Sequence, residues 1–222
     1  MDTDYYEHLC NAGDINMVID SINYMFDKFY PNMFTACHGR YHAMFVVDKV
    51  EHILKSLSYD SRTIELGKVA ALLHDTGMIT GRWKHNRKSA VLSKVIFDGS
   101  DHLSAAEKEM LIQAIDDHSS GKNISSAVGA ALLIADKIDY SKNRILPVEV
   151  LSESAKIQLE IEKADLNISE KSIIINFITT RDFAKGQFMK EYKKPYSLAL
   201  KGAEYLGCTC QLQFNGIEEK LN

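Results

Sequence analysis

The sequence has few of the residues that mark secreted or membrane proteins. Its four cysteines, in a chain of 222 residues, form no disulfide framework, so we interpret them as reduced thiols. No apolar run approaches the roughly 18 residues that a membrane span needs. The N-terminal stretch MDTDYYEHLC has no basic segment followed by an apolar one. These absences predict a cytoplasmic protein with no membrane partner.

The sequence also lacks a large excess of positive or negative charge, and it lacks the common nucleotide-binding motifs. A formal net charge of -4 provides no general attraction to nucleic acid or to an anionic membrane. The chain has no Gly-x-x-x-x-Gly-Lys-Ser/Thr phosphate loop, no Gly-x-Gly-x-x-Gly fingerprint and no His-Glu-x-x-His pair. We therefore predict no clear nucleic-acid binding and none of the site types that these three motifs define.

Prolines are scarce, and long patterns of period 3.6 fill most of the chain, so the fold is predicted to be mainly α. Apolar residues recur at helical spacing in each predicted helix, and Gly77 and the Ser104-x-x-Glu107 capping box mark an end and a start. The predicted helices cover 36–57, 60–77, 85–97, 104–118, 125–140 and 148–164.

The character of the chain changes in its last quarter. Residues 172–178 are a β-branched run and residues 209–214 alternate at period two, so two short strands are predicted to pair across a helical segment that Pro195 interrupts. We therefore divide the chain into a helical domain (1–165) and a small C-terminal α+β appendage (166–222). Residues 181–201 hold six Lys/Arg against two Asp/Glu. Such an excess is usually a solvated helix face, and the alternative is that it steers polyanions.

Four histidines and two aspartates lie on or beside the inward faces of the predicted helices. A single histidine on an apolar face is more often a core residue with a satisfied hydrogen bond than a metal ligand. One or two such residues on each of five successive segments are harder to explain separately, because buried ionisable groups are costly unless they are paired or bind a metal. Helices of a bundle can bring such side chains together. The candidate ligands are His42, His74, Asp75, His85, His118 and Asp136.

These motifs resemble a known family. His42, then His74-Asp75, then Asp136 in Ala-Asp-Lys-Ile-Asp is similar to the H…HD…D signature of the HD-domain metal-dependent phosphohydrolases. The additional His85 and His118 resemble the two histidines of its two-metal branch. Within that branch, the stretch from His118 to an arginine after the Ala-Asp helix is similar to hydrolases that split dinucleoside tetraphosphates symmetrically. The resemblance covers about residues 36–145 and implies an HD-domain helical bundle.

The resemblance also implies ligands and chemistry. His42, His74, Asp75 and Asp136 would hold one metal, and Asp75, His85 and His118 a second, with Asp75 as the bridge. The cofactors would be two divalent transition-metal ions, with Fe or Mn preferred and Co, Ni, Zn or Mg as alternatives. Asp75 is also a candidate catalytic residue. Asp117, beside His118, is a weaker one, since it could orient an imidazole or move a proton.

Further residues near the ligands are candidates for substrate binding. Arg144 matches the arginine after the Ala-Asp helix, and arginine suits bidentate phosphate binding. Arg82 and Lys84 lie on the loop between two ligand helices, and Thr76 could donate a hydrogen bond. The plain alternative for the three basic residues is solvated loop charge. Cys37-His38, at a helix start, is expected to lack nearby partners.

The predicted function is a metal-dependent phosphohydrolase acting on a nucleotide or dinucleoside polyphosphate through a metal-activated water. The partner would be a small-molecule nucleotide, and a homodimer stays open. The alternatives are a di-iron oxygenase of the same superfamily and a non-catalytic nucleotide-binding regulator. Two departures bear on the substrate. Met78 follows the HD pair where many members have a lysine, and the strand-containing tail is foreign to the small tetraphosphate hydrolases.

Overall fold

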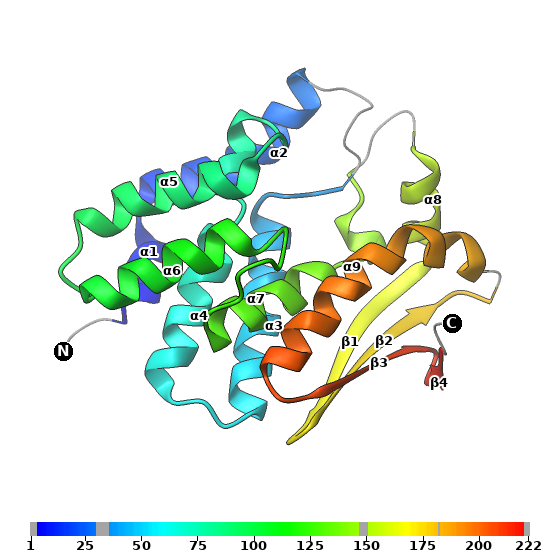
Figure 1. Cartoon of the computed structure of the whole chain (residues 1–222). Helices are drawn as coiled ribbons and strands as arrows, with labels where there is room; N and C mark the ends of the chain where they lie inside the picture. The colour runs from blue at the N-terminus through cyan, green and yellow to red at the C-terminus, as the bar shows by residue number, and fades with distance from the viewer. Residues whose placement is uncertain (1–3, 30–35, 147–150, 182, 220–222) are drawn as a thin grey trace.

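The computed structural model describes residues 4–29, 36–146, 151–181 and 183–219. Most of this part of the chain is helical, which confirms the predicted mainly α class with a small C-terminal α+β part (Figure 1). The helices are α1 (Tyr5–Asn11), α2 (Gly13–Phe29), α3 (Arg40–Ser56), α4 (Ser61–Leu73), η1 (Thr76–Thr80), α5 (His85–Asp98), α6 (Ala105–Asp117), α7 (Ala127–Lys137), η2 (Lys142–Arg144), α8 (Glu153–Leu159) and α9 (Lys185–Tyr205). The strands are β1 (Ile161–Ser169), β2 (Ser172–Thr179), β3 (Thr209–Phe214) and β4 (Ile217–Glu218).

Side-chain caps fix where the ligand-bearing helices begin. The carboxylate of Asp60 accepts a hydrogen bond from the backbone of Thr63 at the start of α4. Ser104 and Glu107 form the predicted capping box at the start of α6. The hydroxyl of Ser126 accepts from the backbone of Gly129 at the start of α7. Each cap satisfies a backbone donor that has no partner within its own helix.

Helices α3, α4 and α7 pack against one another in the middle of the bundle. The predicted inward stripe of α3 is buried, with His42 at one end and apolar residues such as Val46, Val50 and Ile53 along the rest. Helix α7 is buried along most of its length, from Val128 to Asp136. Polar ligands at the ends of such helices are therefore placed in the interior.

The C-terminal strands form one sheet in the order β1-β2-β3-β4. The pairs β1–β2 and β3–β4 are antiparallel, whereas β2 and β3 are parallel and α9 connects them, so the two predicted strands do pair across the helical segment. Helix α9 lies between α7 and the sheet, as Figure 1 shows. The predicted division at 165/166 falls within β1, and that division stays a prediction.

Two local predictions are wrong, and two helices have no predicted counterpart. The helix predicted over 148–164 is wrong from residue 161 onward, because β1 begins there, and residues 148–150 lie outside the described part. Pro195 does not interrupt the long helix, which runs through it. Helices α1 and α2 were not predicted at all. The second difference bears on the site, since α9 continues past Pro195 and packs on α7, the helix that carries Asp136.

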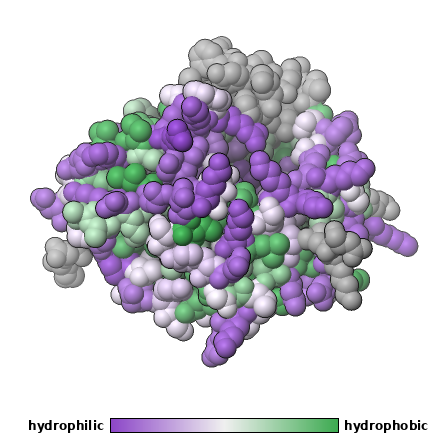
Figure 2. Space-filling model, viewed as in Figure 1, coloured by the Kyte–Doolittle hydropathy of each residue, from purple (hydrophilic) through white to green (hydrophobic). Residues whose placement is uncertain are grey.

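The surface is mostly hydrophilic on the face that Figure 2 shows, with hydrophobic residues in separate groups. Scattered exposed apolar residues are usual for folded proteins. None of the described helices combines the length and apolar character needed to cross a membrane.

Candidate metal centre

Buried imidazole and carboxylate groups from α3, α4 and α7 meet in the middle of the bundle. His42 on α3 and His74 at the end of α4 are fully buried, and their Nε2 atoms lie 3.2 Å apart. Oδ1 of Asp136, near the end of α7, lies 3.3 Å from Nε2 of His42 and 3.9 Å from Nε2 of His74. The ligand atoms of these three residues lie within 4.8 Å of one another. We call them the inner triad.

A second group lies beside the inner triad. Nε2 of His85, at the start of α5, lies 3.1 Å from Nε2 of His118, which follows α6. We call these two residues the outer pair. Oδ1 of Asp75 lies 3.5 Å from His85 Nε2 and 3.6 Å from His118 Nε2. Its Oδ2 lies 3.6 Å from His42 Nε2 and 3.5 Å from His74 Nε2. One carboxylate therefore contacts both groups, with a different oxygen toward each.

Each of the four imidazoles has its Nδ1 atom against an acceptor oxygen. The partners are the carbonyl of Ala71 for His74 (2.7 Å), that of Arg82 for His85 (3.0 Å), that of Ile115 for His118 (2.6 Å) and the carboxylate of Asp139 for His42 (2.7 Å). Because these oxygens only accept, Nδ1 carries the hydrogen, and the neutral ring is left with a lone pair on Nε2. All four lone pairs are directed toward the centre of the site.

This arrangement fits divalent metal ions. Two Nε2 lone pairs that face each other at 3.1 or 3.2 Å repel unless a cation lies between them. Ligand atoms about 2.1 Å from a shared ion lie roughly 3.0 to 3.4 Å apart at tetrahedral or octahedral angles. The shortest separations within the inner triad and the outer pair fall in this range. A buried set of imidazoles and carboxylates is suited to a divalent transition metal.

The electrostatics of the centre favour ionised carboxylates beside a neutral His74, whereas at His42 burial lowers the pKa but the carboxylates of Asp136 and Asp139 outweigh it and raise the pKa. Burial raises the pKa of Asp75, but the histidines around it, His74 first, outweigh burial, and the pKa lies well below its ordinary value. Burial also opposes ionisation of Asp136, yet its ion pair with Lys137 and its contact with His42 bring its pKa well below the ordinary value. Burial lowers the pKa of His74 to about 4. These are the protonation states in which such side chains bind a metal.

Gly77 explains how α5 comes close enough for His85 to join the site. A Cβ atom on Gly77 would lie 2.4 Å from the carbonyl oxygen of His85 and 2.5 Å from the backbone nitrogen of Ser89. The backbone of Gly77 donates to the hydroxyl of Ser89 at 2.9 Å. Helix α4 itself ends at Leu73, so Gly77 serves this close approach and is not the predicted helix terminator. Ser89 thereby has a structural partner.

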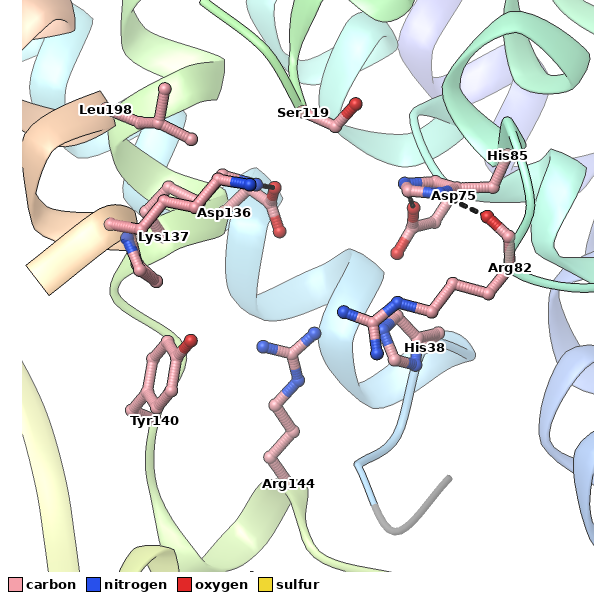
Figure 3. A pocket seen from close by; sticks show the side chains of 12 residues that line it. His38, Asp75, Arg82, His85, Ser119, Asp136, Lys137, Tyr140, Arg144 and Leu198 are labelled. Atoms are coloured by element: carbon pink, nitrogen blue, oxygen red, sulfur yellow. Dashed lines mark hydrogen bonds and ion pairs between the residues drawn. The ribbon is translucent and has the colours of Figure 1, made fainter. Parts of the chain in front are cut away.

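A cavity of about 240 Å³ opens onto Asp75, Asp136 and His85. Figure 3 shows the guanidinium groups of Arg82 and Arg144 on one side of the space between the two aspartates. The basic residues in its lining are Arg82, Lys137, Arg144 and Lys194. A concave site with this lining attracts an anionic ligand.

The structure brings only two of the four predicted substrate-binding residues to the cavity, Arg82 and Arg144. Arg144 is buried, and it donates from Nε to the carbonyl of Cys37 and from Nη1 to that of Asp139. Substrate roles for Thr76 and Lys84 are not supported. The hydroxyl of Thr76 donates to the carbonyl of Leu73, and the exposed Lys84 lies over the Trp83 ring at 4.3 Å.

The structure places Asp117, the weaker candidate catalytic residue, in the turn after α6. Its carboxylate accepts hydrogen bonds from the hydroxyl of Ser120 and from the backbone of Lys122 and Asn123. These bonds close the turn after α6, and Asp117 does not line the cavity of the centre. These contacts account for the position of the carboxylate, and its catalytic role stays a prediction.

Sequence analysis missed several residues at the site. His38 was expected to lack partners, but it lines the cavity, its Nδ1 donates to the carbonyl of Ala36, and its ring centroid lies 5.8 Å from that of His42. Asp139, the last residue of the Ala-Asp-Lys-Ile-Asp stretch, has no predicted role, although it lies three residues after Asp136 and orients His42. That i, i+3 spacing could have indicated a second carboxylate on the same side.

Comparisons with known proteins add little to this description. No family model matches the chain, and no curated protein does either. One similar solved structure is the crystal structure of a predicted HD superfamily hydrolase from an uncultured Thermotogales bacterium. It shares 17% sequence identity, and the match covers 70% of this chain and 91% of that chain with a TM-score of 0.44. So distant a likeness supports no inference about function. The fold and the centre define a mainly helical protein with a buried cluster suited to divalent metal ions.

Proposed function

We propose that this protein is a two-metal phosphohydrolase of the HD superfamily that acts on a nucleotide or dinucleoside polyphosphate. The observation that carries the proposal is the carboxylate of Asp75, whose two oxygens contact different sets of histidines. The inner triad with Asp75 would hold one ion, and the outer pair with Asp75 would hold the other. Iron or manganese suits such mixed imidazole and carboxylate ligands.

Two divalent ions held there would supply Lewis-acid polarisation of a phosphoryl oxygen and an acidified water. The protein's own residues bind and orient. Asp139 holds the His42 ring through Nδ1, and Lys137 neutralises the Asp136 oxygen that faces away from His42. Arg82 and Arg144 would bind the non-bridging phosphate oxygens, because a guanidinium matches their geometry. The surrounding bundle excludes bulk water from all but the cavity side.

The basic lining of the cavity supports a substrate with more than one phosphate. Four basic side chains line a cavity to which only two carboxylates, Asp75 and Asp136, contribute. Bound metal ions would make the site still more positive. A phosphoanhydride carries enough negative charge to match this wall, whereas a neutral polyol, which an oxygenase of this superfamily would use, does not.

A substrate panel tests the proposal. Full-length protein is stripped of metal, reloaded with Mn, Fe or Co, and incubated with diadenosine tetraphosphate, ADP, ATP, a cyclic dinucleotide and p-nitrophenyl phosphate. Product chromatography and phosphate release should show metal-dependent hydrolysis of the phosphoanhydrides, faster than that of p-nitrophenyl phosphate. Oxygen consumption by the iron-loaded protein would instead support the oxygenase. Nucleotide binding without turnover in any metal would support the regulator.

Arg144 offers a sharper test of phosphate binding. Arg144→Ala should raise KM for longer polyphosphates about tenfold and change kcat little, since it removes a charged contact remote from the reacting phosphorus. The same substitution removes the hydrogen bonds that the guanidinium donates to the carbonyls of Cys37 and Asp139, so thermal unfolding is measured alongside. Arg144→Lys retains the charge and should recover part of the loss in KM. An unchanged KM in a folded Arg144→Ala variant would contradict the role.

A further inference from the structure

The C-terminal α+β part contributes a wall to the cavity. Helix α9 supplies Lys194, Pro195 and Leu198 to its lining, although these residues lie far along the chain from every candidate ligand. In Figure 3, Leu198 lies on the side of Lys137 and Asp136, across the cavity from His85. We propose that Lys194 on this wall binds the part of a polyphosphate remote from the reacting phosphorus and so determines specificity for chain length. This inference rests on the proposed function.

Close packing holds α9 in place. A Cβ atom on Gly202 would lie 2.8 Å from the carbonyl oxygen of Ala130 and 2.7 Å from Cγ1 of Ile134, so α9 and α7 approach each other where a larger residue would not fit. Helix α7 also carries Asp136 of the inner triad. This contact joins the wall to the helix that carries Asp136, so the backbone of α9 at Lys194 has a defined position relative to the centre.

An aromatic cluster fixes the same wall from the sheet side. The ring of Tyr140, which lines the cavity, lies 5.7 Å from that of Phe188 and 5.0 Å from that of Tyr192, both on α9. Phe177 of β2 packs on the same two rings at 5.3 and 5.2 Å. Aromatic pairs at these separations stabilise a defined geometry. The sheet thus supports α9 where it borders the cavity.

Arg144 and Lys194 lie at different depths in the cavity, and this difference separates their roles. Arg144 is buried, with its guanidinium held by backbone carbonyls, whereas Lys194 is exposed and still lines the cavity. A residue that is both exposed and in the lining lies at the cavity mouth. A single phosphate bound near the aspartates would not reach the mouth, and only a longer anion would extend to Lys194. Lys194 should therefore discriminate by the number of phosphates.

Lys194 differs from the neighbouring lysine in one useful respect. Lys193 is also exposed on α9 and carries the same charge, but it does not line the cavity. A general attraction of the basic helix for polyanions would depend on both residues about equally, because the long-range field changes little between adjacent positions. A specific contact would depend on Lys194 alone. Lys193 therefore provides the matched control.

The test measures binding of two non-hydrolysed probes, inorganic phosphate and methylenediphosphonate, to the full Mn-loaded chain by calorimetry. Lys194→Met should weaken methylenediphosphonate about fivefold, a magnitude typical of one exposed charge contact, and leave phosphate unchanged. Lys193→Met should change neither dissociation constant by more than about 1.5-fold. Equal effects of the two substitutions, an equal loss for both probes, or no bisphosphonate binding to the wild type would overturn the inference.

Failure of this inference is distinguishable from failure of the proposed function, because the two are measured separately. The substrate panel reports turnover, whereas the calorimetry reports binding without reaction. A wild type that hydrolyses phosphoanhydrides while Lys194→Met binds the bisphosphonate normally would overturn the role of Lys194 alone. A wild type with no turnover that shows the Lys194-dependent binding would overturn the hydrolase and support Lys194 as a polyphosphate contact.

Discussion

The inner triad and the outer pair are built from the same chemical groups, but the protein encloses them differently. The two histidines of the triad are fully buried, and His42 is backed by the carboxylate of Asp139. In the outer pair, His118 is almost fully buried, but the His85 side chain is 19% exposed and borders the cavity. A buried site with a carboxylate behind its imidazole is more preorganised. We infer that the inner triad binds its ion more tightly, and that the outer pair exchanges metal and meets substrate.

The largest effect should come from the residue that the two groups share. Asp75→Ala removes the only carboxylate whose oxygens contact both the triad and the outer pair among the described residues, so both ions should be lost together. We expect elemental analysis to find well under one ion per chain, and hydrolysis to fall at least about a thousandfold. The surface substitution Asp98→Ala is the control. If Asp75→Ala keeps one full equivalent of metal, Asp75 contributes to only one of the two groups, the inner triad or the outer pair.

Separate substitutions in the two halves should give unequal results. His85→Ala should leave about one ion per chain after dialysis, since the triad and Asp75 remain. His42→Ala should leave much less, because the remaining site is the more exposed one. Metal content by mass spectrometry after matched dialysis measures both. If His85→Ala keeps two ions, or if the two variants lose metal equally, the inner triad does not bind its ion more tightly than the outer pair.

A smaller effect is expected from the residue behind the triad. Asp139→Asn retains an acceptor for His42 Nδ1 but removes the negative charge, so metal affinity at the triad should fall about tenfold. Affinity at the outer pair should not change. A competition titration with a chromogenic chelator resolves metal binding at the inner triad from metal binding at the outer pair in each variant. A uniform loss at both steps would indicate a general destabilisation instead.

The smallest effect is expected far from the centre, at the α6 cap. The hydrogen bond from Arg62 lowers the pKa of Glu107 to about 2, with help from the Ser104 cap and against burial, which raises it. Because the folded-state pKa is below the ordinary value, the contribution of Glu107 to stability is present above about pH 4.5 and is lost as the pH falls toward 2. Glu107→Gln should therefore cost about 1 kcal/mol at neutral pH and little at pH 2 to 3.

The control for this prediction is Glu109→Gln on the exposed part of the same helix. Denaturant unfolding at several pH values measures both variants. Metal content should be unchanged in each, since neither residue contacts the centre. A Glu107→Gln effect that is independent of pH would contradict the assignment to the ionised carboxylate.

The cluster of candidate metal ligands was predictable from the sequence because its residues obey local rules. His42 lies on the apolar stripe of α3. The capping box at Ser104 fixes the start of α6, and His118 follows the end of that helix. All six candidate ligands converge, as the pattern of one or two per segment suggested. The pairing of Asp75 with both groups is a tertiary property, and only the family resemblance implied it.

The C-terminal part was harder to predict, for identifiable reasons. The pairing of β1 with β2 shifts register between Ile161 and Lys163, so the buried residues Ile161 and Ala164 are three apart and imitate a helix. Pro195 lacks a backbone donor, but the buried Tyr192 and Tyr196 on either side anchor α9 through it. No local pattern connects Lys194 or Leu198 with the cavity, because packing of α9 on α7 decides their position.

The most direct measurement of the central claim is the state of manganese in the fully loaded protein. Two ions that share the Asp75 carboxylate should give about two equivalents per chain by elemental analysis and an exchange-coupled electron paramagnetic resonance signal. The coupled signal should disappear in His85→Ala, which would retain an isolated ion. A wild-type protein that saturates at one equivalent or fewer, with only the six-line signal of isolated Mn²⁺, would contradict the two-metal centre.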